Sequence, residues 1–274
     1  MCTIDAIKKG FVVATKNPAL ILILFIFNLI WNMINVAMMP APAPITPGMA
    51  PATVPPPTVP PETALLTFLI TITFVLISIF MQGGSLGLVR DYIKGNKMNL
   101  GKFASYGLKY YLRLLGVGVI IILLIVIAAL VAGLVVAAVA PLNNVVATVI
   151  ATLVAIAVGL AGIYLVIRLV MSPYALVCNE TGVIDAMKHS MNVIRRKYFW
   201  KVLLLLVLIV LIAIGIGVLV GIITGLITVA MSPKAGQVII GIVNSLFNGY
   251  VGIVMMAAFM SYYLTLQEKV RAGE

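Results

Sequence analysis

The apolar residues of the chain gather into six long runs, and most of the charged residues lie in the segments around them. A helix rises about 1.5 Å per residue, so about 20 apolar residues cross a hydrocarbon core of about 30 Å. Membrane β-barrels instead use segments of about ten residues with alternating polarity. The continuous runs therefore predict an all-α polytopic membrane helix bundle. Its six predicted spans are residues 19–39, 64–88, 114–140, 145–171, 202–230 and 237–264.

A polar segment near the start of the chain returns before the fifth span. Ile4-Asp-Ala-Ile-Lys8 recurs as Ile184-Asp-Ala-Met-Lys188, and apolar residues follow in both at steps of three and four. Such steps place apolar side chains on one face of a helix. A weaker copy has this spacing over residues 100–110 but no aspartate. We predict one membrane domain, residues 1–274, built of three parallel units, each an interfacial amphipathic helix followed by a hairpin of two spans.

Composition supports a membrane location, and the distribution of charge predicts the orientation. Hydrophobic residues make up 63% of the chain and charged residues 9%, whereas soluble domains are about 25% charged. Of the 18 lysines and arginines, all except Lys234 lie before the first span, after the sixth, or around the loops after spans two and four. Basic loops stay in the cytoplasm, so we predict a cell-membrane protein with both termini cytoplasmic. This placement of the charge argues against a nucleic-acid partner and favours anionic lipid headgroups at the inner face.

The first predicted external loop, residues 40–61, contains ten prolines and no charged residue. Proline has no amide donor and favours an extended polyproline II backbone. This composition is typical of a semi-rigid or disordered spacer between two spans. The alternative is an extended strand on which an external partner docks.

Residues with catalytic or metal-binding chemistry are scarce. The chain has one histidine and two cysteines, which cannot form a zinc site. Gly83-Gly-Ser85-Leu-Gly87 matches the spacing of a nucleophile elbow, but that motif needs a strand–turn–helix and a histidine partner. Here the motif lies in a predicted span, where small residues let helices pack closely. We therefore expect no enzyme activity, no cofactor and no bound metal.

Asparagines supply polar groups inside the predicted spans. Asn28, Asn32 and Asn35 share one face of the first span, and Asn244 and Asn248 share one face of the sixth. An amide in hydrocarbon needs a hydrogen-bond partner. The two sets therefore either bond helices to one another or line a polar pathway, and the sequence leaves both alternatives open.

Charged residues cluster between the fourth and fifth spans. The predicted cytoplasmic interface consists of Arg168, Glu180, Asp185, Arg195, Arg196 and Lys197. Arg168 lies about one helical turn inside the end of the fourth span, where an unpaired charge is costly. We expect it to pair with Glu180 or Asp185, with extension of its side chain to the interface as the alternative.

Two junctions between predicted spans carry motifs that are similar to those of a known family. The first runs from Arg168 to Val177, continues through residues 180–190 and ends at Tyr198-Phe-Trp200, and the second contains Gly84-Ser-Leu-Gly87 followed by Asp91-Tyr92. Both resemble a broad prokaryotic group of six-span membrane proteins. The group includes the membrane domain fused to some glycerophosphodiester phosphodiesterases and its stand-alone relatives. The resemblance implies the architecture but no catalytic residue, because the phosphodiesterase activity belongs to a separate soluble domain.

These features support two alternative functions. The first is a non-enzymatic scaffold or recruiter, whose basic amphipathic helices bind anionic headgroups or a cytoplasmic partner at the inner leaflet. The second is a transporter, channel or lipid-translocating protein that uses the asparagine-lined faces of spans one and six. A protein partner or a second copy of the chain is compatible with either function.

Overall fold

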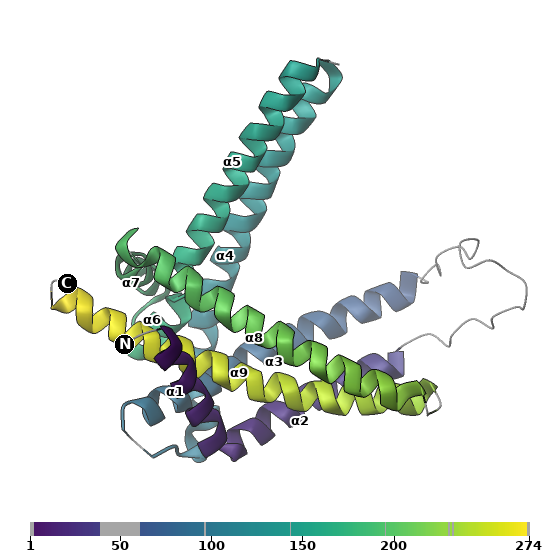
Figure 1. Cartoon of the computed structure of the whole chain (residues 1–274), viewed down its shortest axis with the longest axis vertical. Helices are drawn as coiled ribbons and strands as arrows, with labels where there is room; N and C mark the ends of the chain where they lie inside the picture. Colours follow the sequence, from purple (N-terminus) through teal and green to yellow (C-terminus); the bar gives the residue numbers. More distant parts are fainter. Residues whose placement is uncertain are drawn as a thin grey trace, which may run out of the picture.

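Long α-helices make up most of the chain (Figure 1). The computed structural model describes residues 3–38, 61–95, 97–142, 144–194, 196–229, 231 and 233–272, and these contain no β-strand. The helices are α1 (Thr3–Lys16), α2 (Pro18–Met38), α3 (Pro61–Ile93), α4 (Phe103–Val139), α5 (Val145–Leu169), α6 (Ser172–Asn179), α7 (Val183–Val193), α8 (Arg196–Val229) and α9 (Pro233–Arg271). Two 3-10 turns, η2 (Leu100–Lys102) and η3 (Ala140–Leu142), flank α4. The predicted proline-rich loop lies outside the described residues, apart from Pro61 at the start of α3.

Six of the described helical segments are long and apolar enough to cross a membrane, which confirms the predicted all-α fold. This arrangement is compatible with a multi-pass membrane protein. The differences lie at the helix ends: α4 begins at Phe103 instead of residue 114, and α9 continues to Arg271 instead of residue 264. The extra turns are more polar than the spans, but their lysines, arginines and glutamines are good helix formers. Apolar runs therefore locate the spans but underestimate the helices.

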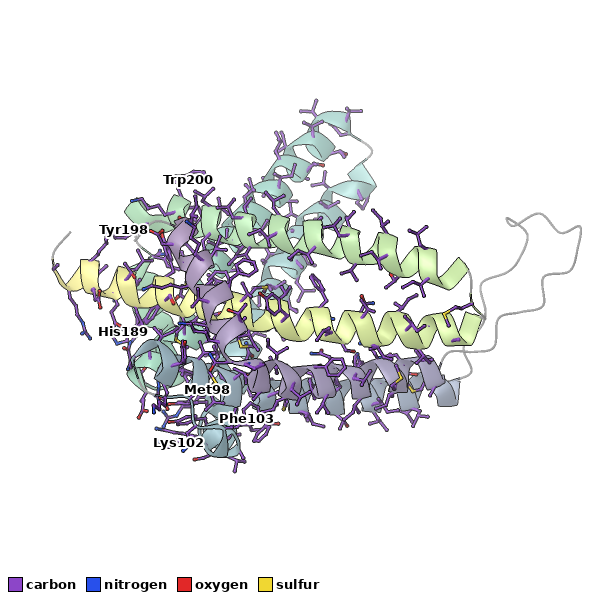
Figure 2. The ribbon with its side chains drawn as sticks, turned by 60° about the horizontal axis from the view of Figure 1, so that its bottom comes forward. Met98, Lys102, Phe103, His189, Tyr198 and Trp200 are labelled. Carbon is purple, nitrogen blue, oxygen red and sulfur yellow. The ribbon has the colours of Figure 1, made fainter. Side chains whose placement is uncertain are left out.

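The long helices do not all extend in one direction. In Figure 1, α2, α3, α8 and α9 extend in similar directions, whereas the α4–α5 hairpin points away from them. The helices meet at one end of the molecule, where α1, α6, α7 and both chain ends also lie. Met98, Lys102, His189 and Tyr198 mark this end in Figure 2. We call it the basic end, formed by α1, α6, α7 and residues 90–113.

The predicted repeat of α1 and α7 extends to their burial. Buried at matching places are Ala6, Gly10, Val13 and Ala14 in the first copy and Ala186, Ser190, Val193 and Ile194 in the third. Lys8 and Lys188 are exposed at matching places as well. The buried faces pack against other helices. Ile4 and Ile184, which were predicted on the apolar faces, are instead 55% and 65% exposed. The two helices thus present one face to the protein and the other outward.

The middle unit differs from the prediction. Helix α4 is continuous from Phe103 to Val139, so no separate amphipathic helix precedes the third span. The buried residues at the start of α4 are Gly107, Tyr110 and Leu114, and their spacing matches that of the buried residues 7, 10 and 14 of α1. Aligned in this way, the middle copy of the repeat begins four residues later than predicted. The difference arises because α1 and α7 each end before their span begins, at Asn17 and Ile194, whereas α4 has no such break.

The buried core is concentrated at the basic end. Ala175, Leu176 and Val177 of the short helix α6 are fully buried, and α6 contacts α3, α4, α7 and α9. Helix α9 contacts α1, α2 and α8 along its length. Away from this end, the apolar side chains of the long helices are largely exposed, as expected of helices that face lipid. The basic end is therefore where tertiary contacts fix the fold.

Candidate functional site

Arg90, near the C-terminal end of α3, is a buried cation whose three guanidinium nitrogens all donate hydrogen bonds. Nη1 lies 2.7 Å from the Tyr110 hydroxyl, 3.1 Å from the Val177 carbonyl oxygen and 2.8 Å from Oε1 of Glu180. Nε and Nη2 donate to Oδ1 of Asp91 at 3.2 and 3.0 Å. The planar, permanently charged guanidinium suits a site that surrounds it with acceptors.

Two tyrosines of α4 flank the guanidinium of Arg90. Its central carbon lies 5.3 Å from the ring centroid of Tyr106 and 5.9 Å from that of Tyr110. A cation at this distance from an aromatic face is stabilised by the ring quadrupole. The Tyr106 hydroxyl also donates to Oδ2 of Asp91 at 2.5 Å, so both carboxylate oxygens of Asp91 are occupied. These contacts hold the end of α3 against the start of α4.

The residues around Arg90 come from the first two predicted units and from the segment between the second and the third. We call them the Arg90 cluster, which consists of Arg90, Asp91, Tyr106, Lys109, Tyr110 and Glu180. The first two lie at the end of α3, the next three at the start of α4, and Glu180 directly after α6. Because these elements are far apart in sequence, the cluster joins the first two units to the segment that precedes the third, at the basic end. It is the principal polar junction that we find between them.

Glu180 ends α6 in a left-handed conformation, with a φ of 54°. This backbone region is uncommon for residues other than glycine, and it closes helices at their C-terminal ends. The carboxylate accepts from Nζ of Lys109 at 2.9 Å as well as from Arg90, and the carbonyl oxygen accepts from Nη1 of Arg113 at 3.0 Å. Hydrogen bonds from Lys109 and then from Arg90 lower the pKa of Glu180 to about 2.

Replacing Glu180 with glutamine is expected to lower the free energy of unfolding by about 1 kcal/mol at neutral pH. The effect is modest because the Glu180 side chain is 47% exposed and water screens the charge. A lowered carboxyl pKa stabilises the fold above the unfolded-state pKa of about 4.3. That contribution disappears as the pH falls through the folded-state pKa of about 2. Thermal unfolding of both proteins from about pH 8 to about pH 2 tests this. A difference that widens in acid would contradict it.

A second set of hydrogen bonds joins α6 to α9 and to the residue that directly follows α3. Asn179 donates from Nδ2 to the Tyr263 hydroxyl at 2.9 Å, and its Oδ1 accepts from Nε2 of Gln267 at 2.9 Å. Lys94 donates to the Cys178 carbonyl oxygen at 3.3 Å. The C-terminal turn of α6, which would otherwise leave carbonyl groups unpaired, is therefore held from two sides.

Arg168 does not make the expected ion pair with Glu180 or Asp185. Its Nη2 donates to the Met191 carbonyl oxygen at 2.7 Å, and its own carbonyl oxygen accepts from Oγ of Ser190 at 2.7 Å. Met191 lies in the last turn of α7, where unpaired carbonyl groups carry partial negative charge. That helix end provides a nearer partner for the arginine than either carboxylate.

The other residues of the predicted interface are placed separately. Asp185 lies in the first turn of α7, where a carboxylate favours the positive end of the helix dipole. Arg195 lies outside the described residues. Arg196 and Lys197 begin α8, but their side chains are also outside the description. Their predicted role at the cytoplasmic interface stays a prediction.

Asn32 makes a contact between two of the long helices. Its Nδ2 donates to Oγ of Ser245 at 2.8 Å and approaches the Gly241 carbonyl oxygen at 3.4 Å, both on α9. Asn28 and Asn35 instead donate to carbonyl groups of their own helix, at 2.8 and 2.9 Å. The asparagine face of α2 therefore makes one interhelical contact and two contacts within α2.

The asparagines of α9 do not bond to those of α2. Within the described chain, neither Asn244 nor Asn248 has a recorded hydrogen bond, and Asn248 is exposed. An unpaired amide within an apolar helix needs lipid-headgroup, water or protein partners. The polar pathway predicted from these residues stays a prediction.

The elbow-like motif of α3 is a helix-packing contact. A Cβ added to Gly84 would lie 2.8 Å from the Phe103 ring, and one added to Gly87 would lie 2.5 Å from the Tyr106 ring. The Ser85 hydroxyl donates to the Met81 carbonyl oxygen of its own helix at 2.8 Å. No group of three histidine, cysteine, aspartate or glutamate side chains among the described residues could hold a metal ion.

Sequence reasoning did not select the centre of the Arg90 cluster. Arg90 was counted with the other cations of its loop, and only Glu180 was predicted as an interface residue. One available signal is the pair Arg90-Asp91 at the end of an apolar run, and another is the spacing of four between Tyr106 and Tyr110. That spacing places both rings on one helical face.

Comparison with known families gives one match. Residues 1–266 match the family described as a domain of unknown function, DUF7847. No curated protein and no solved structure gives a significant match. The family match gives no link to the membrane domain of glycerophosphodiester phosphodiesterases.

Proposed function

The chain belongs to the DUF7847 family, and we propose that this domain of unknown function is a non-enzymatic membrane scaffold. In this proposal its basic end lies at the inner face of the cell membrane. In this proposal the six apolar helices anchor the protein in the bilayer. The Arg90 cluster fixes the first two units relative to one another and to the segment before the third. The outward faces of the basic end then bind anionic headgroups and recruit a partner to the membrane.

The observation that carries the proposal is the outward polar face that α1 and α7 repeat, which carries Lys8, Lys9 and Lys16 in α1 and Lys188 with Asp185 in α7. Both helices bury one face in the protein and expose the other, with Lys8 and Lys188 at matching exposed places. Trp200 and Lys201, near the start of α8, are exposed as well, Trp200 to 71%. Basic residues with an aromatic ring are typical of a protein surface at the membrane interface. Each such cation near an anionic leaflet contributes about 1 kcal/mol.

Fluorescence of Trp200 in lipid vesicles tests this proposal. The chain has two tryptophans, so Trp31→Phe leaves Trp200 as the reporter, and Trp200→Phe leaves Trp31 as the matched control. Brominated lipids quench a tryptophan that they contact. We expect brominated phosphatidylglycerol to associate with the Trp200 site about fivefold more strongly than brominated phosphatidylcholine. The preference should weaken at about 1 M salt, because salt screens charges.

Neutralising the nearby cations identifies the source of this preference. Changing Arg195, Arg196, Lys197 and Lys201 to glutamine together should weaken the preference at Trp200, because these four cations lie within five residues of the reporter in the sequence. Asn32→Leu should leave it unchanged, since Asn32 contacts α9 instead of the basic surface. The proposal would be contradicted if the two brominated lipids quenched Trp200 equally in the protein whose basic residues are unchanged.

A transporter, channel or lipid-translocating protein is the second candidate. It is favoured by Asn244 and Asn248, which have no recorded hydrogen bond within the described chain. A polar pathway would give these amides water or substrate as partners. We also propose that the resemblance to phosphodiesterase-associated membrane domains reflects distant kinship of architecture, without their enzymatic activity.

A further inference from the structure

A cavity of about 320 Å³ lies at the basic end between α1, the end of α3 and α9. Lys8 and Lys9 line it from α1, Tyr92 and Ile93 line it from α3, and Ser261 lines it from α9. Ligand sites in proteins measure about 300–1,000 Å³, so the cavity is large enough for a small group. It is separate from the Arg90 cluster, none of whose residues lines it.

Ser261 is a buried hydroxyl without a partner. The residue is 3% exposed, and its Oγ has no hydrogen-bond partner in the structure. Hydroxyls in apolar helices ordinarily donate to the carbonyl four residues earlier, as Ser245 does to Gly241 at 2.6 Å and Thr265 does to Ser261 at 3.0 Å. Buried polar groups left unpaired are rare in folded proteins. Four buried side-chain polar atoms of the described residues lack a partner, and Ser261 Oγ is the one among them whose residue lines this cavity, so a polar ligand bound here would satisfy it.

The charge and polarity of the lining indicate what that ligand is. Lys8 and Lys9 supply two ammonium groups, and neither has an ion pair recorded with a described residue. Val12, Val13 and Ile93 make the remaining wall apolar. Two cations and a hydroxyl donor suit a phosphate, and an apolar wall beside them suits the hydrocarbon of an amphiphile.

We propose that this cavity binds the phosphate headgroup of one anionic phospholipid, with its hydrocarbon along the apolar wall. The inference rests on the proposed inner-face location, and it adds a defined site to a diffuse basic surface. The two lysines bind the phosphate, and the Ser261 hydroxyl donates to one of its oxygens. A free phosphate would meet the same three donors but would leave the apolar wall unused.

Native mass spectrometry of the detergent-purified full chain tests the site. With added phosphatidylglycerol, the unmodified protein should retain one tightly bound lipid, and phosphatidylcholine should bind at least about tenfold more weakly. Ser261→Ala should weaken phosphatidylglycerol binding about tenfold, as expected for loss of one hydrogen bond to a charged group. Lys8→Gln with Lys9→Gln should weaken it further. The control Lys16→Gln changes a lysine of the same helix that does not line the cavity, and it should bind like the unmodified protein.

The arms of the experiment separate the sources of the phosphate. Protection against thermal unfolding by short-chain phosphatidylglycerol, without protection by inorganic phosphate, supports the lipid. Equal protection by inorganic phosphate would overturn the lipid assignment, and so would equal lipid affinity in Ser261→Ala and Lys16→Gln. If the cavity variants behave like the control while Trp200 still prefers anionic lipid, only the cavity site fails. If Trp200 shows no preference, the proposed function fails whatever the cavity binds.

Discussion

Replacing Arg90 with leucine is expected to lower the free energy of unfolding by about 3 kcal/mol. The substitution removes the cation that Asp91 and Glu180 share. Removing one member of a buried ion pair costs about 3–5 kcal/mol, because the remaining charge stays poorly solvated. The Asp91 side chain is 14% exposed, but that of Glu180 is 47% exposed, so the lower end of this range applies. The Val177 carbonyl group loses its hydrogen bond from Arg90 as well, and so does the Tyr110 hydroxyl, which still donates to Glu180 at 3.2 Å.

Unfolding by a denaturing detergent, followed by circular dichroism, measures this effect. Lys109→Gln is the matched control, because it removes the other cation of Glu180 from a position that is 42% exposed. An exposed ion pair contributes about 0–1 kcal/mol, so the control should remain close to the unmodified protein. Arg90→Lys keeps the charge but loses the planar fork, and its stability should be intermediate. If Arg90→Leu were as stable as Lys109→Gln, the cluster would not hold the units together.

Replacing Gly10 with leucine is expected to displace α1 from α9. A Cβ at position 10 would lie 2.5 Å from the Val254 carbonyl oxygen and 3.2 Å from the Ala258 Cβ. Both atoms are held in place by the backbone of α9, so they cannot move aside as the end of a flexible side chain would. Overpacking of this kind costs about 1–3 kcal/mol. Because α1 packs mainly against α9, the strain is relieved most easily by release of α1.

Trypsin cleavage at the lysines of α1 measures this release in the reconstituted protein. Cleavage follows the population of the open state when opening and closing are fast, and about 1.4 kcal/mol corresponds to a tenfold change. We expect Gly10→Leu to be cleaved at least about tenfold faster than the unmodified protein. Gly118→Leu is the control, because nothing lies within 4 Å of a Cβ added there. Equal cleavage of the two variants would show that α1 does not need the close approach at Gly10.

The fold was predictable where local sequence determines it. Six long apolar runs give six long helices, since an apolar segment in lipid must satisfy its backbone groups internally. The repeat of α1 and α7 was also readable, because both copies retain the same helical spacing. The directions of the long helices were not predictable. Their nearly uniform apolar surfaces carry little information about which neighbour each one contacts.

The candidate site could be predicted only in part, because its partners are distant in sequence. Arg90 contacts Tyr110 and Glu180, which lie 20 and 90 residues away. The sequence suggested nearby carboxylates for Arg168, whereas the structure supplies the carbonyl group of Met191 at the end of α7. Matching oppositely charged side chains cannot identify a backbone carbonyl group as the partner of an arginine. The sequence singled out Asn32 as a polar residue of the first apolar run, but it did not identify Ser245 of α9 as its partner.

Accessibility of Asn32 and Asn248 to water tests the central claim, that the protein is a scaffold without a polar pathway. Each is changed to cysteine in a chain with Cys2→Ser and Cys178→Ala, and a membrane-impermeant thiol reagent is added outside intact cells. The account predicts that neither position is labelled in the folded protein and that both are labelled after denaturation. Asn32 donates a hydrogen bond to Ser245 of α9, and the scaffold proposal places the exposed position 248 against lipid. Labelling of both positions in the folded protein would reveal a water-filled path and contradict the scaffold.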